Sequence, residues 1–384
     1  MAGTSHAPLG RWASSVLEPD PTEVPPLQVV RLRVRSTSHL LELARDWIPR
    51  YGANVKTVVL LWWSTTDVHA LTALSEIPKV QQALDAAERL TGFRSSAASR
   101  SQRAFELHDA LIRTILRGCP NLVSLKVRSD ATTASYLTSY DGETPIGPGG
   151  TNDALREFGG RISSADLSGA RDCLSILSYL DMMPNVEHLR IYVAAEVSLF
   201  DMQSLFRKLS QLPQLGSLEL HNVDSSALQS LSASGLPCSN LKHLTLSGTL
   251  GHELRYLVDI LRLHPITSLC LRDLSISGID TWFPFLLSHP NSLKLENLSL
   301  AGKTDLALLD IFDAAPLKHV EVCAGGGRIS DRTTPQRITA FSEEHRASLL
   351  SFKADRVLFD AAELSAINRA LEQEGVPVRV ITVK

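Results

Sequence analysis

The sequence has few cysteines and no long apolar run. Its five cysteines are widely spaced and form no Cys-x-x-Cys pair. We therefore expect reduced thiols rather than a disulfide framework or a zinc site, with no metal and no cofactor. No run of about 18 consecutive apolar residues occurs, and the proline-rich residues 1–26 lack the apolar core of a signal peptide. These features predict an intracellular location, cytoplasmic or nuclear, and no membrane partner.

The chain also has little net charge and few aromatic residues. Lysine and arginine number 38 and aspartate and glutamate 41, a net charge of -3, and aromatics make up 6% of the chain. A charge this small does not attract polyanions, so we expect no nucleic-acid partner. Hydrophobic residues make up 44% of the chain, enough to bury a large core. The 384 residues exceed one compact domain of roughly 100–200 residues, which requires two domains or a repetitive architecture.

A short unit recurs along the chain. It consists of a proline, one or two polar residues, and apolar residues at positions 1, 4 and 6 of the segment that follows. From Val186 onward the successive first positions are 29, 26, 25, 29 and 22 residues apart, which indicates a repeat protein. The copies, some without the proline, are residues 120–127, 184–191, 213–220, 240–246, 265–271, 295–300 and 316–322.

Each unit predicts a strand followed by a helix. Positions 4 and 6 alternate with polar residues, as in a short strand with one buried face. The segments 202–212 and 254–261 carry apolar residues at helical spacing, and Pro213 and Pro265 follow them. A strand and a helix of about 25 residues cannot bury their own apolar faces, so the units must stack into a curved parallel sheet with helices outside.

These units resemble leucine-rich repeats over residues 110–355. The resemblance implies an α/β solenoid with the parallel sheet on the concave side and helices on the convex side. The asparagine or cysteine that this family places three residues after the last strand leucine would fall at Val223, Thr249 and Leu274. We therefore do not expect the polar ladder that this residue supplies to the turn, and we expect irregular repeats with irregular turns and uneven curvature.

The irregular repeats and the amphipathic segment ahead of them further resemble the substrate-receptor part of fungal F-box leucine-rich-repeat proteins. That resemblance implies recognition of a target protein by the repeats. Residues 1–30 are too short and too proline-rich for an F-box module, so recruitment of a ubiquitin-ligase core is not expected.

The domain organisation follows from these patterns. We expect a loosely ordered lead-in at 1–28, an N-terminal capping region with degenerate repeats at 29–118, leucine-rich repeats at 119–355 and a C-terminal cap at 356–384. Within the repeats, residues 129–165 have little apolar periodicity and predict a long mobile insertion. This insertion is either a lid over the concave face or a tolerated surface loop.

Candidate binding residues follow from the strand pattern, because positions 3, 5 and 7 of each unit point away from the helices. The predicted concave surface is polar and mixed in charge, with Arg190 beside Glu219 and Glu321 beside Lys353. Its predicted partner-binding residues are Lys126, Arg128, His188, Arg190, Tyr192, Glu219, His221, His243, Thr245, Cys270, Arg272, His319 and Glu321.

Little in this surface indicates catalysis. His188, His243 and His319 occupy equivalent positions in units two or more apart, too distant to share one metal ion. His243 and Cys270 form the one plausible nucleophile pair, and no third group clearly orients the histidine. The sequence therefore predicts a non-enzymatic scaffold that binds a protein on its concave face. The alternative is an enzyme with an unusual active site under the 129–165 insertion.

Overall fold

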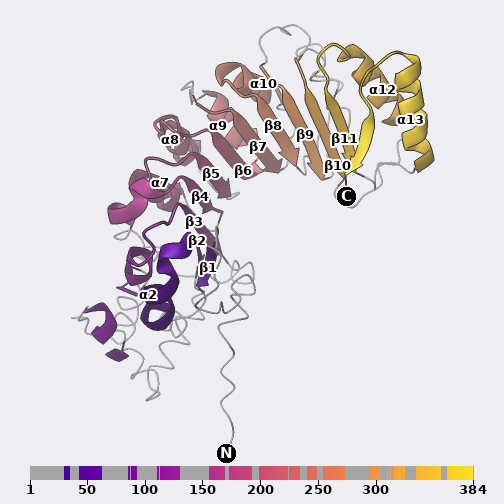
Figure 1. Cartoon of the computed structure of the whole chain (residues 1–384). Coiled ribbons are helices and arrows are strands. Elements are labelled where there is room, and N and C mark those ends of the chain that lie inside the picture. Colours follow the sequence, from indigo (N-terminus) through magenta and orange to yellow (C-terminus); the bar gives the residue numbers. More distant parts are fainter. Residues whose placement is uncertain are drawn as a thin grey trace, which may run out of the picture. The chain divides into compact units, whose positions relative to one another are not determined.

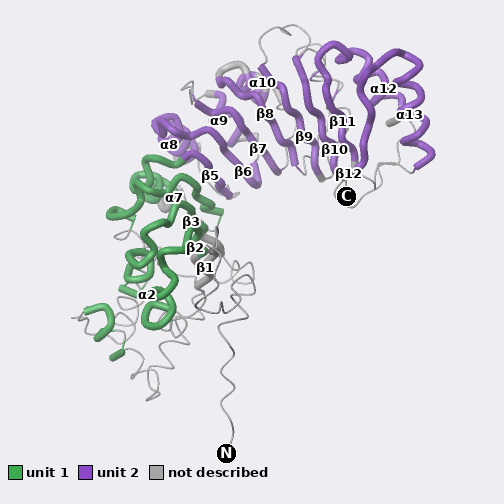
Figure 2. Tube along the Cα trace, viewed as in Figure 1, with its two compact units in different colours: residues 1–170, 175–186 green, residues 171–174, 187–384 purple. Residues whose placement is uncertain are grey.

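In the computed structural model the chain divides into two compact units. Unit 1 contains residues 1–170 and 175–186, and unit 2 contains residues 171–174 and 187–384 (Figure 2). The structure describes residues 30–34, 43–62, 85–86, 88–92, 110–111, 113–129, 155–168, 173–192, 199–223, 225–233, 240–248, 254–272, 294–302, 309, 312, 315–324, 334–355 and 361–383.

Unit 1 is built on parallel strands that pair in chain order. Leu125 lies opposite Val58 on one side and opposite Ala165 on the other, and all three side chains are buried. These contacts give unit 1 a core on one face of its strands. Its strands are β1 (Val30–Val34), β2 (Val55–Trp62), β3 (Ser124–Ser129) and β4 (Ser164–Leu167). Its helical elements are η2 (Leu43–Trp47), α2 (Ile48–Tyr51), η3 (Gly52–Asn54), η6 (Gly159–Arg161) and most of α7 (Cys173–Met182).

Unit 2 repeats the same parallel arrangement over more strands. The strands follow one another in chain order, and the helices between them cover one face of the sheet (Figure 1). The strands are β5 (His188–Tyr192), β6 (Ser217–Val223), β7 (His243–Gly248), β8 (Ser268–Arg272), β9 (Asn297–Gly302), β10 (His319–Ala324), β11 (Ser351–Asp355) and β12 (Val380–Val383). The helices are α8 (Leu199–Ser210), α9 (Ser225–Ala233), α10 (Leu254–Leu263), α12 (Thr334–Glu344) and α13 (Ala361–Gln373).

One buried leucine row runs across the strands of unit 2. Leu218 pairs with Leu244, Leu244 with Leu269, and Leu269 with Leu298. Each of these side chains is at most 2% exposed. Because equivalent positions of successive repeats share one interior, the chain is an α/β leucine-rich-repeat solenoid, as the sequence predicted.

The polar ladder between repeats differs from the one considered from the sequence. It lies at the start of the strands, where one carbonyl accepts two N–H groups from the next repeat. The carbonyl of Glu187 accepts from Gly216 and Ser217, and that of Gly216 accepts from Lys242 and His243. The same arrangement continues through the carbonyls of Lys242, Thr267, Glu296 and Lys318.

Asparagine side chains add to this ladder at three strand starts. Asn121 donates to the carbonyl of Ala53, Asn185 to that of Gly160, and Asn240 to that of Pro213. These residues belong to the Pro-Asn or Asn-led part of the repeat. These bonding groups precede the strand leucines, so they are separate from the ladder after the last strand leucine that the sequence put in doubt.

The predicted insertion is shorter than 129–165. Residues 155–158 form a helical turn, η6 follows, and β4 begins at Ser164. Leu155 and Ile162 are buried, which fixes this part against the core. The loop prediction is therefore wrong for residues 155–165, and residues 130–154 lie outside the described residues.

Both predicted capping regions contain regular elements. Strand β1 and strand β2 occupy the segments expected at the N-terminal side, and α13 and β12 occupy those expected at the C-terminal side. The Asn368 side chain donates to the carbonyl of Val380 at 3.0 Å, and its Oδ1 accepts from the N–H of Val380 at 2.8 Å. These two bonds fix α13 to β12. The domain boundaries themselves stay a prediction.

Candidate functional site

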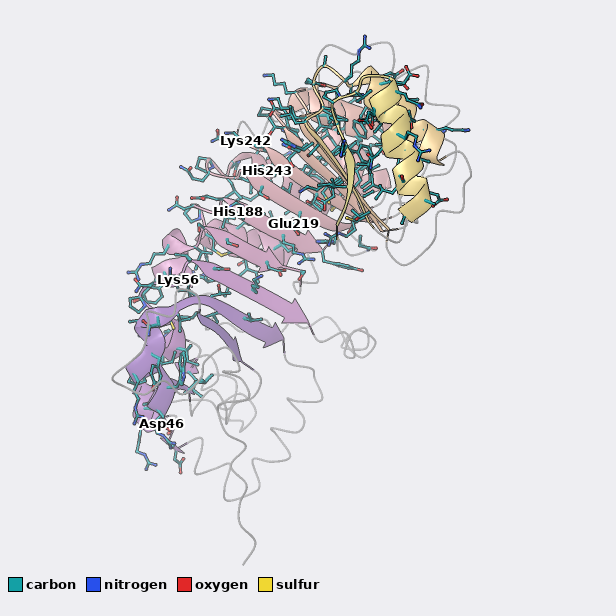
Figure 3. The ribbon with its side chains drawn as sticks, turned by 45° about the vertical axis from the view of Figure 1, so that its right-hand side comes forward. Asp46, Lys56, His188, Glu219, Lys242 and His243 are labelled. Atoms are coloured by element: carbon teal, nitrogen blue, oxygen red, sulfur yellow. The ribbon has the colours of Figure 1, made fainter. Side chains whose placement is uncertain are left out.

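The candidate surface is the helix-free face, defined as the strand positions of unit 2 whose side chains alternate with the buried row. In β5 and β8 the side chains alternate between buried and more exposed along the strand. His188 and His243, labelled in Figure 3, are exposed at the first positions of β5 and β7. The predicted residues on this face are His188, Arg190, Tyr192, Glu219, His221, His243, Thr245, Cys270, Arg272, His319 and Glu321.

The other two predicted residues belong to unit 1. Lys126 is half-buried on β3, opposite Val59 of β2 and Asp166 of β4. Arg128 is also on β3, and its side chain lies outside the described residues. Neither can be assigned to the surface of unit 2.

Strand register brings one part of the helix-free face together. Arg190 lies opposite Glu219, as predicted, and Tyr192 lies opposite His221. His221 lies opposite Ser247, and Ser247 opposite Arg272. The predicted neighbours Glu321 and Lys353 are also in register, further along the sheet.

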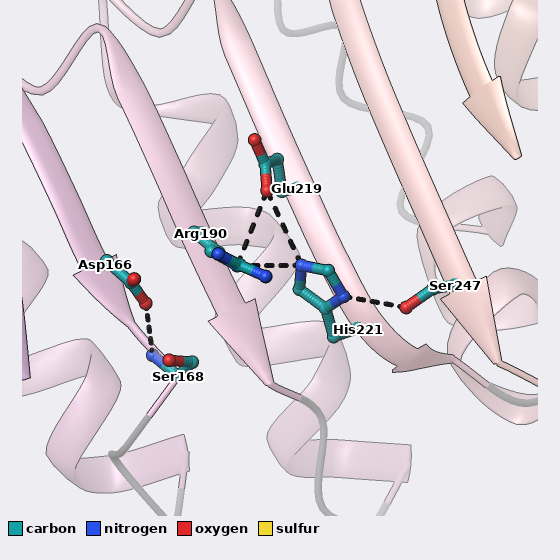
Figure 4. Close-up of polar contacts among 6 residues, drawn as sticks. All are labelled: Asp166, Ser168, Arg190, Glu219, His221 and Ser247. Carbon is teal, nitrogen blue, oxygen red and sulfur yellow. Dashed lines mark hydrogen bonds and ion pairs between the residues drawn. The ribbon is translucent and has the colours of Figure 1, made fainter. Parts of the chain in front are cut away.

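Four of these side chains form a connected polar cluster (Figure 4). Arg190 Nε lies 2.8 Å from His221 Nε2 and 3.4 Å from Glu219 Oε2. Glu219 Oε2 also lies 3.5 Å from His221 Nε2. On the other side of the ring, His221 Nδ1 lies 2.7 Å from Ser247 Oγ. We name Arg190, Glu219, His221 and Ser247 the β5–β7 cluster.

The arginine fixes the tautomer of the histidine in this arrangement. A guanidinium can only donate hydrogen bonds, so at 2.8 Å the Nε2 atom of His221 must accept. The neutral ring then carries its proton on Nδ1, and Nδ1–H donates to Ser247 Oγ. The His221 side chain is only 13% exposed, so surrounding residues hold this orientation.

The carboxylate of the cluster stays ionised over a wide pH range. Its contact with His221 and the positive charges of Arg190 and Arg272 lower the pKa of Glu219, and partial burial opposes them. Glu219 is therefore an anion that offsets the charge of Arg190 at neutral pH.

A backbone irregularity lies beside the cluster. Asn222 has a φ of 58°, and the register between β6 and β7 shifts between His221 and Val223. Gly248, at the end of β7, has a φ of 147°, and a Cβ there would collide with the Val223 carbonyl. Bulges of this kind redirect side chains, and this one follows directly after His221.

The proposed nucleophile pair is diagonal, as the sequence predicted. His243 lies opposite Ser268, and Cys270 lies opposite Thr245. His188, His243 and His319 start β5, β7 and β10, so they lie two and three strands apart. Within the described residues, no group of three or more His, Cys, Asp and Glu side chains could hold a metal ion.

Ser247 was not among the predicted site residues. Its position facing away from the core was visible in the repeat pattern, but its contact with His221 depends on side-chain orientation. Two buried histidines, His264 and His345, were also missed. Both ring nitrogens of His345 lie near carbonyl oxygens, Nδ1 at 3.1 Å from Phe341 O and Nε2 at 3.3 Å from Phe312 O.

Cys119, Cys270 and Cys323 are free thiols in the described residues. Cys119 is buried, and burial raises the pKa of its thiol to about 12, so it is unreactive as a nucleophile.

In the described part of the chain, no helix combines the length and the apolar character needed to cross a bilayer.

Comparisons with known proteins give the fold little further context. No known family model matches the sequence, and no curated protein matches it significantly. Among solved structures, internalin C2 from Listeria monocytogenes is similar, with 14% identity over 62% of this chain and 91% of that chain. The TM-score of 0.26 is too low for any inference from that protein.

Proposed function

We propose that the chain is a non-enzymatic recognition scaffold that binds a macromolecular partner, a protein, through the helix-free face of unit 2. The β5–β7 cluster is the observation that supports it most directly. The cluster holds charged and hydroxyl groups in fixed positions on an extended surface, next to an exposed Tyr192. Fixed polar groups beside an exposed aromatic residue are typical of binding surfaces.

The resemblance to fungal F-box leucine-rich-repeat proteins gives the proposal a finer form. In that form the repeats select a target protein as an F-box-like substrate receptor would, inside the cell. Recruitment of a ubiquitin-ligase core is not part of the proposal.

An enzymatic role is the alternative, and the β5–β7 cluster could be taken for a hydrolytic triad. Ser247, His221 and Glu219 follow one another through polar contacts. A general base must accept the serine proton, but the Nδ1 of His221 already carries a proton because Arg190 donates to Nε2. This tautomer cannot activate Ser247, which favours the binding scaffold.

Affinity capture from native extract with mass spectrometry tests the proposal. We expect Tyr192→Ala and His188→Ala to lose the proteins that the intact chain recovers. Arg207→Glu on α8 is the control, because Arg207 is exposed on the helix side. Recovery of the same proteins by both face variants would contradict the proposal. Turnover by the chain that is abolished by His243→Ala and Cys270→Ala would establish the enzymatic alternative.

A further inference from the structure

A row of polar side chains crosses the carboxyl ends of four neighbouring strands on the helix-free face. Register places Tyr192 of β5 beside His221 of β6, His221 beside Ser247 of β7, and Ser247 beside Arg272 of β8. Tyr192 and Arg272 are exposed, so both ends of the row are accessible, whereas Ser247 is buried, at 9% exposure, and lies recessed between them.

The hydrogen-bond direction within the β5–β7 cluster determines what Ser247 can offer. Arg190 donates to His221, and His221 in turn donates to Ser247 Oγ. The serine oxygen is therefore already an acceptor, and its own proton is not used in that bond. When a cation donates a hydrogen bond to a ring and the ring donates one to a hydroxyl, each hydrogen bond polarises the next group. Ser247 is thus set as a donor toward an electron-rich group.

Arg272 supplies charge at the same place. It pairs in register with Ser247 on one side and with Ala301 on the other, so no carboxylate occupies either adjacent position. Across β5–β8, the predicted binding residues include the cations Arg190 and Arg272 and the single carboxylate Glu219, which contacts Arg190 at 3.4 Å. The surplus positive charge therefore lies at Arg272, beside the oriented hydroxyl.

We propose that Ser247 and Arg272 form a carboxylate-binding subsite and that the partner presents an acidic peptide segment across β5–β8. This inference rests on the proposed function and specifies the chemistry of its partner. Four strands about 4.8 Å apart span roughly 14 Å, the length of about four extended residues at about 3.3 Å each. Such a segment reaches from Arg272 to the Tyr192 ring.

Binding of short labelled peptides to the full chain tests the subsite. The probes are eight-residue peptides rich in glutamate, in glutamine or in lysine, measured by fluorescence anisotropy at low salt. We expect the glutamate peptide to bind most tightly and Arg272→Gln to weaken it about tenfold, since hydrogen bonds to charged groups are among the stronger ones. Ser247→Ala should weaken it about fivefold, and Ser247→Thr, which keeps the hydroxyl, should not.

A second variant tests whether His221 acts as a positioning residue through Ser247. We expect His221→Phe to weaken the glutamate peptide as much as Ser247→Ala does. The double variant should be no weaker than either single one, because both remove the same oriented donor. Ser210→Ala, which removes a hydroxyl at the end of α8 on the helix side, is the matched control and should leave the affinity unchanged.

Two results would overturn the inference: equal affinity for the glutamate and glutamine peptides, or intact affinity in both Arg272→Gln and Ser247→Ala. Either result leaves the proposed function standing if Tyr192→Ala still loses the captured partner. Loss of the captured partner on Arg207→Glu, with retention on Tyr192→Ala, would end the proposed function as well.

Discussion

Unit 2 contains the same histidine-serine pair at two places on its helix-free face. His221 and Ser247 join β6 to β7 at 2.7 Å, and His319 and Ser351 join β10 to β11 at 2.8 Å. In both pairs Nδ1 of the ring meets the serine hydroxyl across neighbouring parallel strands. The distances alone would make the two pairs equivalent.

Their surroundings differ. The His221 side chain is 13% exposed, and Arg190 contacts its second nitrogen, whereas His319 is exposed at the first position of its strand. An exposed pair exchanges with water and contributes little to stability, while a half-buried one with a cationic donor keeps one orientation. The comparison shows that a fixed tautomer requires the arginine as well as the serine.

The largest expected change in unfolding free energy concerns the buried leucine row, which lies beneath both histidine-serine pairs. Leu244→Ala and Leu298→Ala should each lower the free energy of unfolding by about 2–5 kcal/mol, because each truncation leaves a cavity in a close-packed interior. Thr245→Ala, on the other face of β7, should change it by no more than about 0.5 kcal/mol. Urea denaturation followed by circular dichroism measures both. A small loss at either leucine would show that the row is not a continuous core.

A smaller effect should separate the two histidines. His221→Phe should cost about 1–2 kcal/mol of unfolding free energy, since Arg190 and Ser247 both lose a partner in a half-buried place. His319→Phe should cost no more than about 0.5 kcal/mol, as expected for an exposed site. The same denaturation experiment compares them, and equal losses would remove the distinction between the two pairs.

The smallest effect should appear in the pH dependence. The pKa of Glu219 is lowered in the folded chain, so its stabilising contribution is present above its ordinary value of 4.5 and is lost as the pH falls through the folded pKa. Because Glu219 is 41% exposed, we expect this contribution to stay below about 1 kcal/mol.

Urea denaturation of Glu219→Gln and of the intact chain between pH 3 and pH 7 measures the contribution of Glu219 to the unfolding free energy. The difference in unfolding free energy should be constant near neutral pH and should shrink in acid. Glu321→Gln, on β10, is the matched control from the other region. A difference for Glu219→Gln that grows as the pH falls would contradict the assigned direction.

The sequence predicted the stacked strands because each full repeat keeps its leucines in phase. Leu218, Leu244 and Leu269 were expected to share an interior, and their register and burial confirm it. Arg190 and Glu219 were predicted as neighbours for the same reason, because in-register parallel strands place equivalent positions side by side.

Strand β4 escaped prediction because its repeat is weak. Ile162, Ala165 and Leu167 occupy the apolar positions 1, 4 and 6, and all are buried. No proline precedes them, and alanine contributes too little apolar surface to mark a strand among polar residues. A search that allowed small residues at position 4 would have found it.

The hydrogen bonds of the β5–β7 cluster could not be predicted from the apolar repeat pattern. That His221 turns toward Ser247 depends on side-chain rotamers and on the bulge at Asn222. Neither leaves a signal in apolar spacing, since the bulge residue is polar and sits where a turn residue is also acceptable. Sequence analysis therefore located the surface but not its hydrogen-bond directions.

The side-chain amide of Asn368 caps β12, the last described strand of unit 2. A side-chain amide contains the same N–H and C=O groups as a peptide bond, and this one bonds to both polar groups of Val380. At that residue it takes the place that the backbone of a further repeat would fill. An incoming strand would first have to displace it, so α13 protects the outer margin of β12 from growth by chance association.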